Sequence, residues 1–164
     1  MATVGRMIRA ATPDDVDAVA RVWHAAWFDG HAGNVPDELL AHRDLDAFVR
    51  RTRDRIGSMW VAEHDGAIVG LAVVHDDEVD QLFVDRSARG TGVATALLRR
   101  AEDAIRAAGH GVAWLAVVPG NDRARAFYTL EGWRDAGTFV LPADTADGTI
   151  EVPSHRYEID LAER

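Results

Sequence analysis

The 164-residue sequence contains no cysteine and no lysine, and both absences narrow its chemistry. Without cysteine there are no disulfides, no thiolate metal ligands and no cysteine nucleophiles. All 18 basic residues are arginine, which excludes a Walker A phosphate loop and a pyridoxal Schiff base, because both need lysine. The seven histidines lack the spacing of metal ligands, so no metal site is expected.

Long apolar runs are also missing. No stretch reaches the roughly 20 apolar residues that cross a bilayer, and the first residues lack the apolar segment of a secretory signal. The formal charge of −9 disfavours a nucleic-acid partner and suits a cationic small molecule or a peptide amine better. We therefore expect one cytoplasmic domain over residues 1–164 that contacts neither membrane nor nucleic acid.

The spacing of apolar residues alternates between a helical period and the period of strands. Thr12-Pro13 is a typical helix start, and Asp65-Gly66 is a typical hairpin turn. A polar loop is expected around Asp147-Gly148. The expected strands are 7–10, 59–63, 68–74, 78–84, 112–118, 133–141 and 154–161, and the expected helices are 12–29, 36–56, 93–108 and 121–130. The order β-α-α-β-β-β-α-β-α-β-β predicts an α+β fold with a mixed, mostly antiparallel central sheet flanked by helices.

A glycine loop lies between the fourth expected strand and the helix that follows it. Gly90 and Gly92 bring no Cβ, and the unpaired amides of a first helical turn attract an anion such as pyrophosphate. Arg89 would add a charge-assisted hydrogen bond. The same glycines also suit a tight strand–helix turn without a ligand. A dinucleotide-binding fingerprint fits less well, because Thr95 replaces its third glycine and the next strand ends at Val118 without an acidic residue.

Two segments resemble the GNAT superfamily of N-acetyltransferases. The first, Arg89-x-x-Gly92-x-Ala94, matches the family's acetyl-CoA motif Q/R-x-x-G-x-G/A. The second, Asn121-x-x-Ala124-x-x-Phe127-Tyr128 followed by Gly132-Trp133, matches the family's segment N-x-x-A-x-x-F-Y…G-[FW]. Both occur in the family's order with a strand between them, and the resemblance spans about residues 7–161.

The resemblance implies that acetyl-CoA is the co-substrate. The backbone of residues 82–84 would pair with the pantetheine arm, and the amides of residues 90–95 would bind the pyrophosphate. Asn121 would contact the arm of the cofactor, and it can serve as a helix N-cap at the same time. The implied cofactor-binding residues are Leu82, Phe83, Val84, Arg89, Gly90, Thr91, Gly92, Val93, Ala94, Thr95 and Asn121.

The reaction needs groups that move protons. An alkyl amine with a pKa of ~10.4 is protonated at neutral pH, and removing its proton costs about 4–5 kcal/mol, so a base or a water chain is useful. Glu78 and Asp80 share one face of their expected strand, so either carboxylate could lie beside the acetyl group as the base. The resemblance gives Glu78 the position of the family's glutamate base. Acids at a strand's start are also often only solvated. Tyr128 matches the tyrosine that donates a proton to the thiolate leaving group, although a core aromatic residue would give the same pattern. The resemblance also implies that a strand N–H near Leu82 would stabilise the oxyanion.

Trp23, Trp27 and His31 lie in the region that forms the acceptor pocket of the resembling family. Aromatic faces suit a cation, although tryptophans four residues apart are also typical of a helix packed in a core. The sequence thus predicts direct acetyl transfer to a primary amine of a small molecule or peptide, and the family habit implies a homodimer. The alternative is a non-catalytic acyl-CoA-binding or regulatory domain of the same fold, and a dinucleotide-dependent oxidoreductase comes third.

Overall fold

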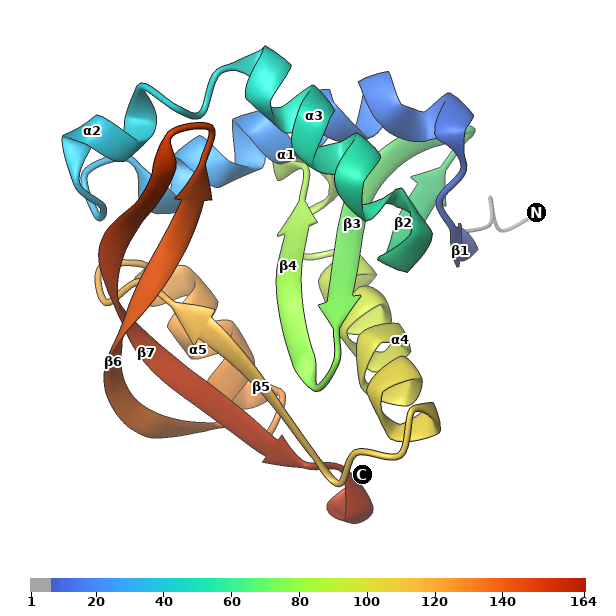
Figure 1. Ribbon diagram of the computed structural model, residues 1–164. Coiled ribbons are helices and arrows are strands. Elements are labelled where there is room, and N and C mark those ends of the chain that lie inside the picture. Colours follow the sequence, from blue (N-terminus) through green and yellow to red (C-terminus); the bar gives the residue numbers. More distant parts are fainter. Residues whose placement is uncertain (1–6) are drawn as a thin grey trace.

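A seven-stranded sheet forms the centre of the computed structural model, which describes residues 7–164 (Figure 1). The strand order is β1-β2-β3-β4-β5-β7-β6. Neighbouring strands are antiparallel except β4 and β5, which are parallel. The strands are β1 Met7–Ala10, β2 Met59–His64, β3 Ala67–His75, β4 Glu78–Val84, β5 Val112–Val117, β6 Arg134–Thr145 and β7 Gly148–Asp160. The mixed, mostly antiparallel sheet predicted from the sequence is confirmed.

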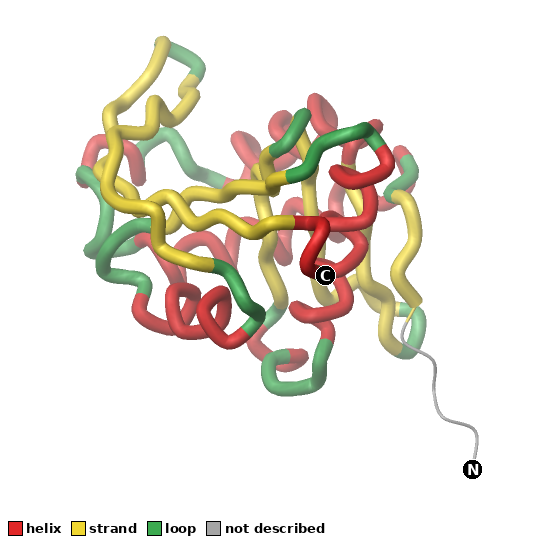
Figure 2. The backbone as a smooth tube through the Cα atoms, turned by 90° about the horizontal axis from the view of Figure 1, so that it is seen from below, coloured by secondary structure: helices red, strands yellow, loops and turns green. Residues whose placement is uncertain are grey.

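Helices cover both faces of this sheet (Figure 2). They are α1 Val16–His31, α2 Asp37–Leu40, α3 Leu45–Arg55, α4 Val93–Ala107 and α5 Asp122–Leu130. Side chains alternate along a strand, so Leu71 and Val73 pack with α1 and α3, whereas Ala62 and Ala72 pack with α4 on the other face. Helix α5 lies on the α4 side against β5. Within residues 7–164, no helix has both the length and the apolarity needed to cross a bilayer.

The structure corrects two boundaries. The helix expected over 36–56 is two helices, because the turn after α2 ends at Asp44, whose carboxylate accepts a hydrogen bond from the amide of Ala47 at 2.8 Å and starts α3. The polar loop expected between the last two strands is instead a continuous hairpin, β6 to β7. Its alternating side chains, including Ala143 and Ile150, still pack on the core, and Gly148, at φ +125°, permits the tight turn.

The two parallel strands of the sheet separate almost at once. The structure pairs β4 with β5 only at Glu78 and Trp114, where the amide of Trp114 donates to the carbonyl oxygen of Asp77 at 3.1 Å. Beyond this pair the strands diverge (Figure 1), with β3 on the far side of β4 and β7 on the far side of β5. The facing backbone edges of β4 and β5 are therefore open to a ligand. We call this opening the wedge.

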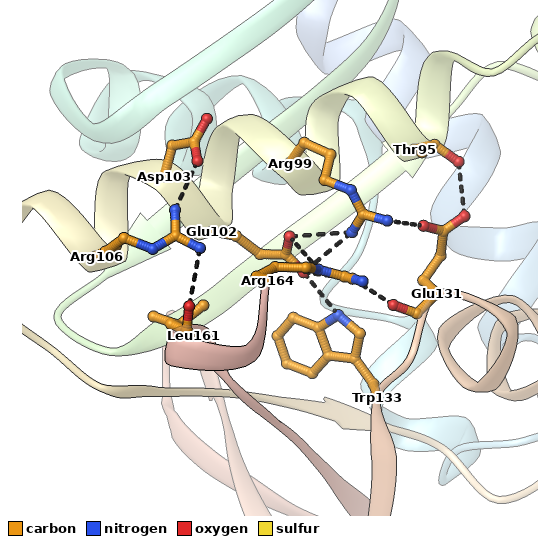
Figure 3. A network of polar contacts seen from close by, with 9 residues as sticks. All are labelled: Thr95, Arg99, Glu102, Asp103, Arg106, Glu131, Trp133, Leu161 and Arg164. Carbon is orange, nitrogen blue, oxygen red and sulfur yellow. Dashed lines mark hydrogen bonds and ion pairs between the residues drawn. The ribbon is translucent and has the colours of Figure 1, made fainter.

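A buried carboxylate fastens the chain's C-terminal segment to α4 (Figure 3). Glu102 is only 1% exposed and accepts hydrogen bonds from Arg164 Nη2 at 2.9 Å, Arg99 Nη1 at 3.0 Å and Trp133 Nε1 at 3.1 Å. Arg99 also binds Glu131, the residue after α5. Because α4 begins at the glycine loop, this network fixes the helix that presents the loop.

Candidate active site

The wedge opens into a cavity of about 660 Å³. This size suits a small-molecule site. Its walls come from β4 and β5, from α1 and α3, from the start of α5 and from the β6–β7 hairpin. The sequence-predicted residues that line it are Trp27, His31, Glu78, Asp80, Leu82, Phe83, Asn121 and Tyr128. Residues far apart in the sequence thus meet around one space.

The glycine loop adopts a conformation that favours glycine. Gly90 and Gly92 have φ values of +75° and +87°, in the left-handed region where a Cβ is disfavoured. Gly92 is the N-cap of α4 and has no side chain with which to cap the first turn. The loop is fixed from inside, because the hydroxyl of Thr91 donates to the carbonyl oxygen of Ala88. A helix start of this kind fits the pyrophosphate of coenzyme A.

The remaining predicted loop residues have defined places. Val93 is buried at 1% exposure, so its side chain belongs to the core and only its backbone can serve a ligand. Ala94 and Thr95 complete the first turn of α4. The Thr95 hydroxyl donates to Glu131 at 2.8 Å, and Val84 packs at the edge of the core cluster that includes Val93.

Positive charge gathers beside the glycine loop. Arg89 forms an ion pair of 2.9 Å with Asp29 on α1, and Arg86 reaches the same carboxylate at 2.7 Å. The pKa of Arg123 is lowered by burial and, secondly, by the positive charge of Arg89, so Arg123 lies near this group. The residue predicted to bind phosphate is therefore held by Asp29, and the surplus of guanidinium groups suits an anion.

Asn121 is placed to serve both as a helix N-cap and as a contact for a ligand in the cavity. Its side-chain oxygen accepts a hydrogen bond from the amide of Ala124 at 3.2 Å, which makes it the N-cap of α5, and the residue also lines the cavity. Helix α1 approaches it closely at Gly30, where an added Cβ would lie 2.7 Å from Asn121 Nδ2. Glycine at position 30 therefore allows α1 and the start of α5 to meet.

Tyr128 is a buried residue at the cavity wall. It is 8% exposed, and its ring packs against Phe127, Trp133 and Tyr157. Burial raises the pKa of its hydroxyl above the ordinary value, so the group stays protonated at neutral pH. Among residues 7–164 the hydroxyl has no hydrogen-bond partner, which leaves its proton available for a ligand.

Glu78 and Asp80 line the cavity from the start of β4, in different electrostatic settings. Burial, followed by the neighbouring charges of Asp80 and Asp77, raises the pKa of Glu78 to about 7. Asp80 instead accepts a hydrogen bond from Arg55 Nε at 3.2 Å. One carboxyl group therefore titrates near neutral pH, and the other is paired with an arginine.

Of the three α1 residues predicted to contact the acceptor, two line the cavity and one, Trp23, does not. Trp23 is fully buried and does not reach the cavity wall, because it packs in the core against Phe48. Trp27 and His31 do line the cavity, with stacked rings 4.5 Å apart. His31 Nδ1 lies 2.8 Å from the carbonyl oxygen of Trp27, so this nitrogen carries the hydrogen and donates. Burial lowers the pKa of His31 to about 4, so the ring is neutral.

Three arginines at the cavity were not anticipated from the sequence. Arg43, Arg51 and Arg55 line it from α3 and from the turn before it. Arg51 and Arg55 follow Phe48 by three and seven residues, which are positions of the apolar stripe of a helix. Arginines at apolar-stripe positions of an expected helix were the signal in the sequence that could have indicated these cavity residues. Among the described residues, the structure contains no group of three or more acidic or histidine side chains that could hold a metal.

The comparisons with known proteins agree on one family. A model described as "Acetyltransferase (GNAT) family" matches residues 17–133. An uncharacterized N-acetyltransferase of Mycobacterium tuberculosis is 32% identical over 96 residues, which cover 56% of this chain and 62% of that protein. A mycothiol acetyltransferase of Sanguibacter keddieii is 32% identical over 157 residues, which cover 88% of this chain and 49% of that protein. The chain thus spans less than two thirds of either relative.

Solved structures share the fold. An acetyltransferase of Salmonella typhimurium, determined with its cofactor acetyl-CoA, superposes with a TM-score of 0.71 at 18% identity, covering 96% of this chain and 94% of that one. Strands β2 to β5, the wedge and the glycine loop lie within the residues that the family model matches, whereas β1, β6 and β7 lie outside them. The protein belongs to the GNAT family of acetyltransferases.

Proposed function

We propose that the protein transfers an acetyl group from acetyl-CoA directly to a primary amine of a small molecule or peptide. The observation that carries this proposal is that Glu78 and Tyr128 line one cavity, which opens at the wedge. One group has a pKa of about 7, and the other remains a protonated donor. The acetyl-CoA bound in the Salmonella protein and the acetyltransferase names of the relatives support the same reaction class.

The chain's backbone would hold the co-substrate. The free edge of residues 82–84 would pair with the amides of the pantetheine arm, as an added strand does. The amides of residues 90–95 would bind the pyrophosphate, with Arg89 beside them, and Asn121 would contact the arm. Backbone binding of this kind presents the thioester to the cavity.

Glu78 would accept the proton of the acceptor amine. A base with a pKa of about 7 lies closer to an alkyl ammonium of pKa ~10.4 than an ordinary carboxylate does, which lowers the cost of proton transfer. Asp80 keeps its ion pair with Arg55 and raises the proton affinity of Glu78 through its charge. In this proposal Glu78 is the base and Asp80 is a positioning residue.

Bond changes then follow in order. The neutral amine nitrogen attacks the thioester carbon, forming the C–N bond and an oxyanion that a backbone N–H near Leu82 would stabilise. The C–S bond breaks, and Tyr128 donates its proton toward the departing sulfur. As the tetrahedral adduct collapses, its nitrogen loses a second proton to solvent. The proton held by Glu78 returns through solvent to Tyr128, so the whole reaction releases one proton. The products are an amide and coenzyme A with a free thiol.

The test is a panel of primary amines incubated with acetyl-CoA, with free thiol and acetylated product both measured. We expect thiol release that depends on the amine and falls in the Tyr128→Phe and Glu78→Gln variants. The rival function, a non-catalytic acyl-CoA-binding or regulatory domain, predicts tight acetyl-CoA binding without thiol release for any amine. That result, with the folded wild-type chain, would contradict the proposal.

A further inference from the structure

The acceptor end of the cavity contains positive charge that the proposed reaction does not use. Arg43 and Arg51 both line the cavity, and Arg43 is only 3% exposed. Neither forms an ion pair with any carboxylate of residues 7–164, in contrast to Arg55, which binds Asp80. Buried arginines are normally paired, because an uncompensated charge away from water is costly.

Several nitrogens of these two guanidinium groups have no partner. Arg51 Nε and Nη1 and Arg43 Nε are buried and make no hydrogen bond. The other Arg43 nitrogens are fixed, since Nη2 donates to the carbonyl oxygen of Asp144 at 2.7 Å and Nη1 to that of His42 at 3.4 Å. A buried donor without an acceptor is destabilising, so an anionic ligand beside these guanidinium groups would be favourable.

Aromatic rings hold both groups in place. The Arg51 guanidinium lies 4.5 Å from the ring centre of Trp23 and 5.4 Å from that of Phe48, and Arg43 lies 5.8 Å from the ring centre of Trp27. Contacts of this kind stabilise a guanidinium and fix its position in the cavity wall. Burial also lowers the pKa of Arg51 to about 9, which agrees with a charge that lacks its counterion.

Charges of both signs line the cavity. Glu78 and Asp80 lie at the start of β4, and Arg51 lies one helical turn before Arg55, the partner of Asp80. Two further carboxylates, Asp54 and Asp144, belong to the cavity wall, but both residues are exposed and neither lies within 4.0 Å of a guanidinium nitrogen of Arg43 or Arg51. A ligand in this cavity therefore meets two carboxyl groups, on Glu78 and Asp80, and two arginines that form no ion pair within residues 7–164.

We propose that Arg51 and Arg43 bind a carboxylate of the acceptor, so that the preferred substrate carries both a primary amine and a carboxylate. This inference rests on the proposed function for the amine end. The amine would face Glu78, and the carboxylate would pair with the guanidinium groups of Arg51 and Arg43 in the cavity wall. The aromatic rings expected to contact a cation instead support these arginines.

Matched acceptors test the inference. Each amino acid in the amine panel is compared with its carboxamide, which keeps the amine and loses the charge. We expect kcat/KM to favour the carboxylate by about 10–100-fold in the wild type. Arg51→Met retains most of the apolar stem and should abolish the preference, mainly through KM. Arg50→Met is the matched control, because Arg50 is exposed on the same helix and does not line the cavity.

Binding supplies a second readout that needs no turnover. Calorimetry with coenzyme A first shows whether each variant is folded. Butyrate and its uncharged analogue butyramide are then titrated into the protein separately, and their binding is compared. We expect butyrate binding that is lost in Arg51→Met and in Arg43→Met and is kept in Arg50→Met. If carboxamides are acetylated as well as carboxylates, and Arg51→Met changes neither ratio nor butyrate binding, the inference is wrong and the proposed function stands. If butyrate binds through Arg51 but no amine is acetylated, the proposed function fails and the anion site remains.

Discussion

Replacing Glu78 by glutamine tests the proton acceptor directly. With a pKa of about 7, the wild-type carboxyl is about half ionised at pH 7 and about one tenth ionised at pH 6. We therefore expect kcat/KM to fall about tenfold for each pH unit below 7. Glutamine cannot accept the proton, so Glu78→Gln should lower kcat/KM at pH 8 by about 10²–10⁴-fold and remove this limb of the pH profile.

The assay is thiol release between pH 5.5 and 9 with saturating acetyl-CoA, with coenzyme A binding as the check that each variant is folded. Asp80→Asn is the informative companion variant. Removing the charge of Asp80 takes away the second-largest cause of the raised pKa of Glu78, so the acidic limb should move to lower pH and remain. A Glu78→Gln profile that keeps the limb near pH 7 would refute the assignment of Glu78 as base.

Stability gives a test of the same pKa without catalysis. The folded-state pKa of Glu78 is raised above its ordinary 4.5 to about 7, so the folded protein holds this proton more tightly than the unfolded chain does. The stabilising contribution is complete below pH 4.5 and is lost as the pH rises through 7. Glu78→Gln should therefore be more stable than the wild type at pH 8, by about 1–2 kcal/mol after allowing for the partial exposure of this side chain. If the difference in free energy of unfolding between Glu78→Gln and the wild type were the same at pH 8 as at pH 4.5, the raised pKa would be contradicted.

Three further predictions concern single positions. Tyr128→Phe should lower kcat by about 10²-fold or more and change the free energy of unfolding by less than about 0.5 kcal/mol, because the hydroxyl has no protein partner to lose; an unchanged kcat would exclude Tyr128 as the acid. Gly92→Ala should weaken coenzyme A binding in calorimetry and cost about 1–2 kcal/mol of stability, since φ is +87°. Trp133→Phe should cost about 1–3 kcal/mol in urea unfolding by removing a donor to buried Glu102, whereas Asp103→Ala, which breaks an exposed ion pair, should cost less than about 1 kcal/mol.

Features that depend on neighbours in the chain were predictable from the sequence. The glycine loop and the helix after it are encoded within a few residues, and the structure has Gly90 and Gly92 in the left-handed conformation there. The strands from β2 to β4 follow from β-branched runs and the Asp65-Gly66 turn. The polar residues around Asp147-Gly148 instead suggested a loop. The β6–β7 hairpin forms there because its side chains pack on the core, which is a long-range effect.

The acceptor side was less predictable for the same reason. Whether Trp23 lines a cavity or fills the core depends on Phe48, a residue 25 positions away. Arg43 is held by a backbone oxygen of the distant hairpin, at Asp144. The resemblance predicted Glu78, Tyr128 and Asn121 as site residues, and all three line the cavity. The arginines within the apolar stripe of α3 could be noticed in the sequence, but which of them has a carboxylate partner emerges only once the chain is folded.

The single β4–β5 pair has a consequence for how the sheet holds together. Strands β1 to β4 and strands β5 to β7 form two sub-sheets that share one backbone pair, Glu78 with Trp114, and the packing of α4. A molecule hydrogen-bonded to both edges would connect them as a partial eighth strand. Amide hydrogens of residues 112–117 should then exchange with solvent more slowly when coenzyme A is present. The free energy needed to separate the two sub-sheets would therefore rise with the fraction of protein that has the cofactor bound.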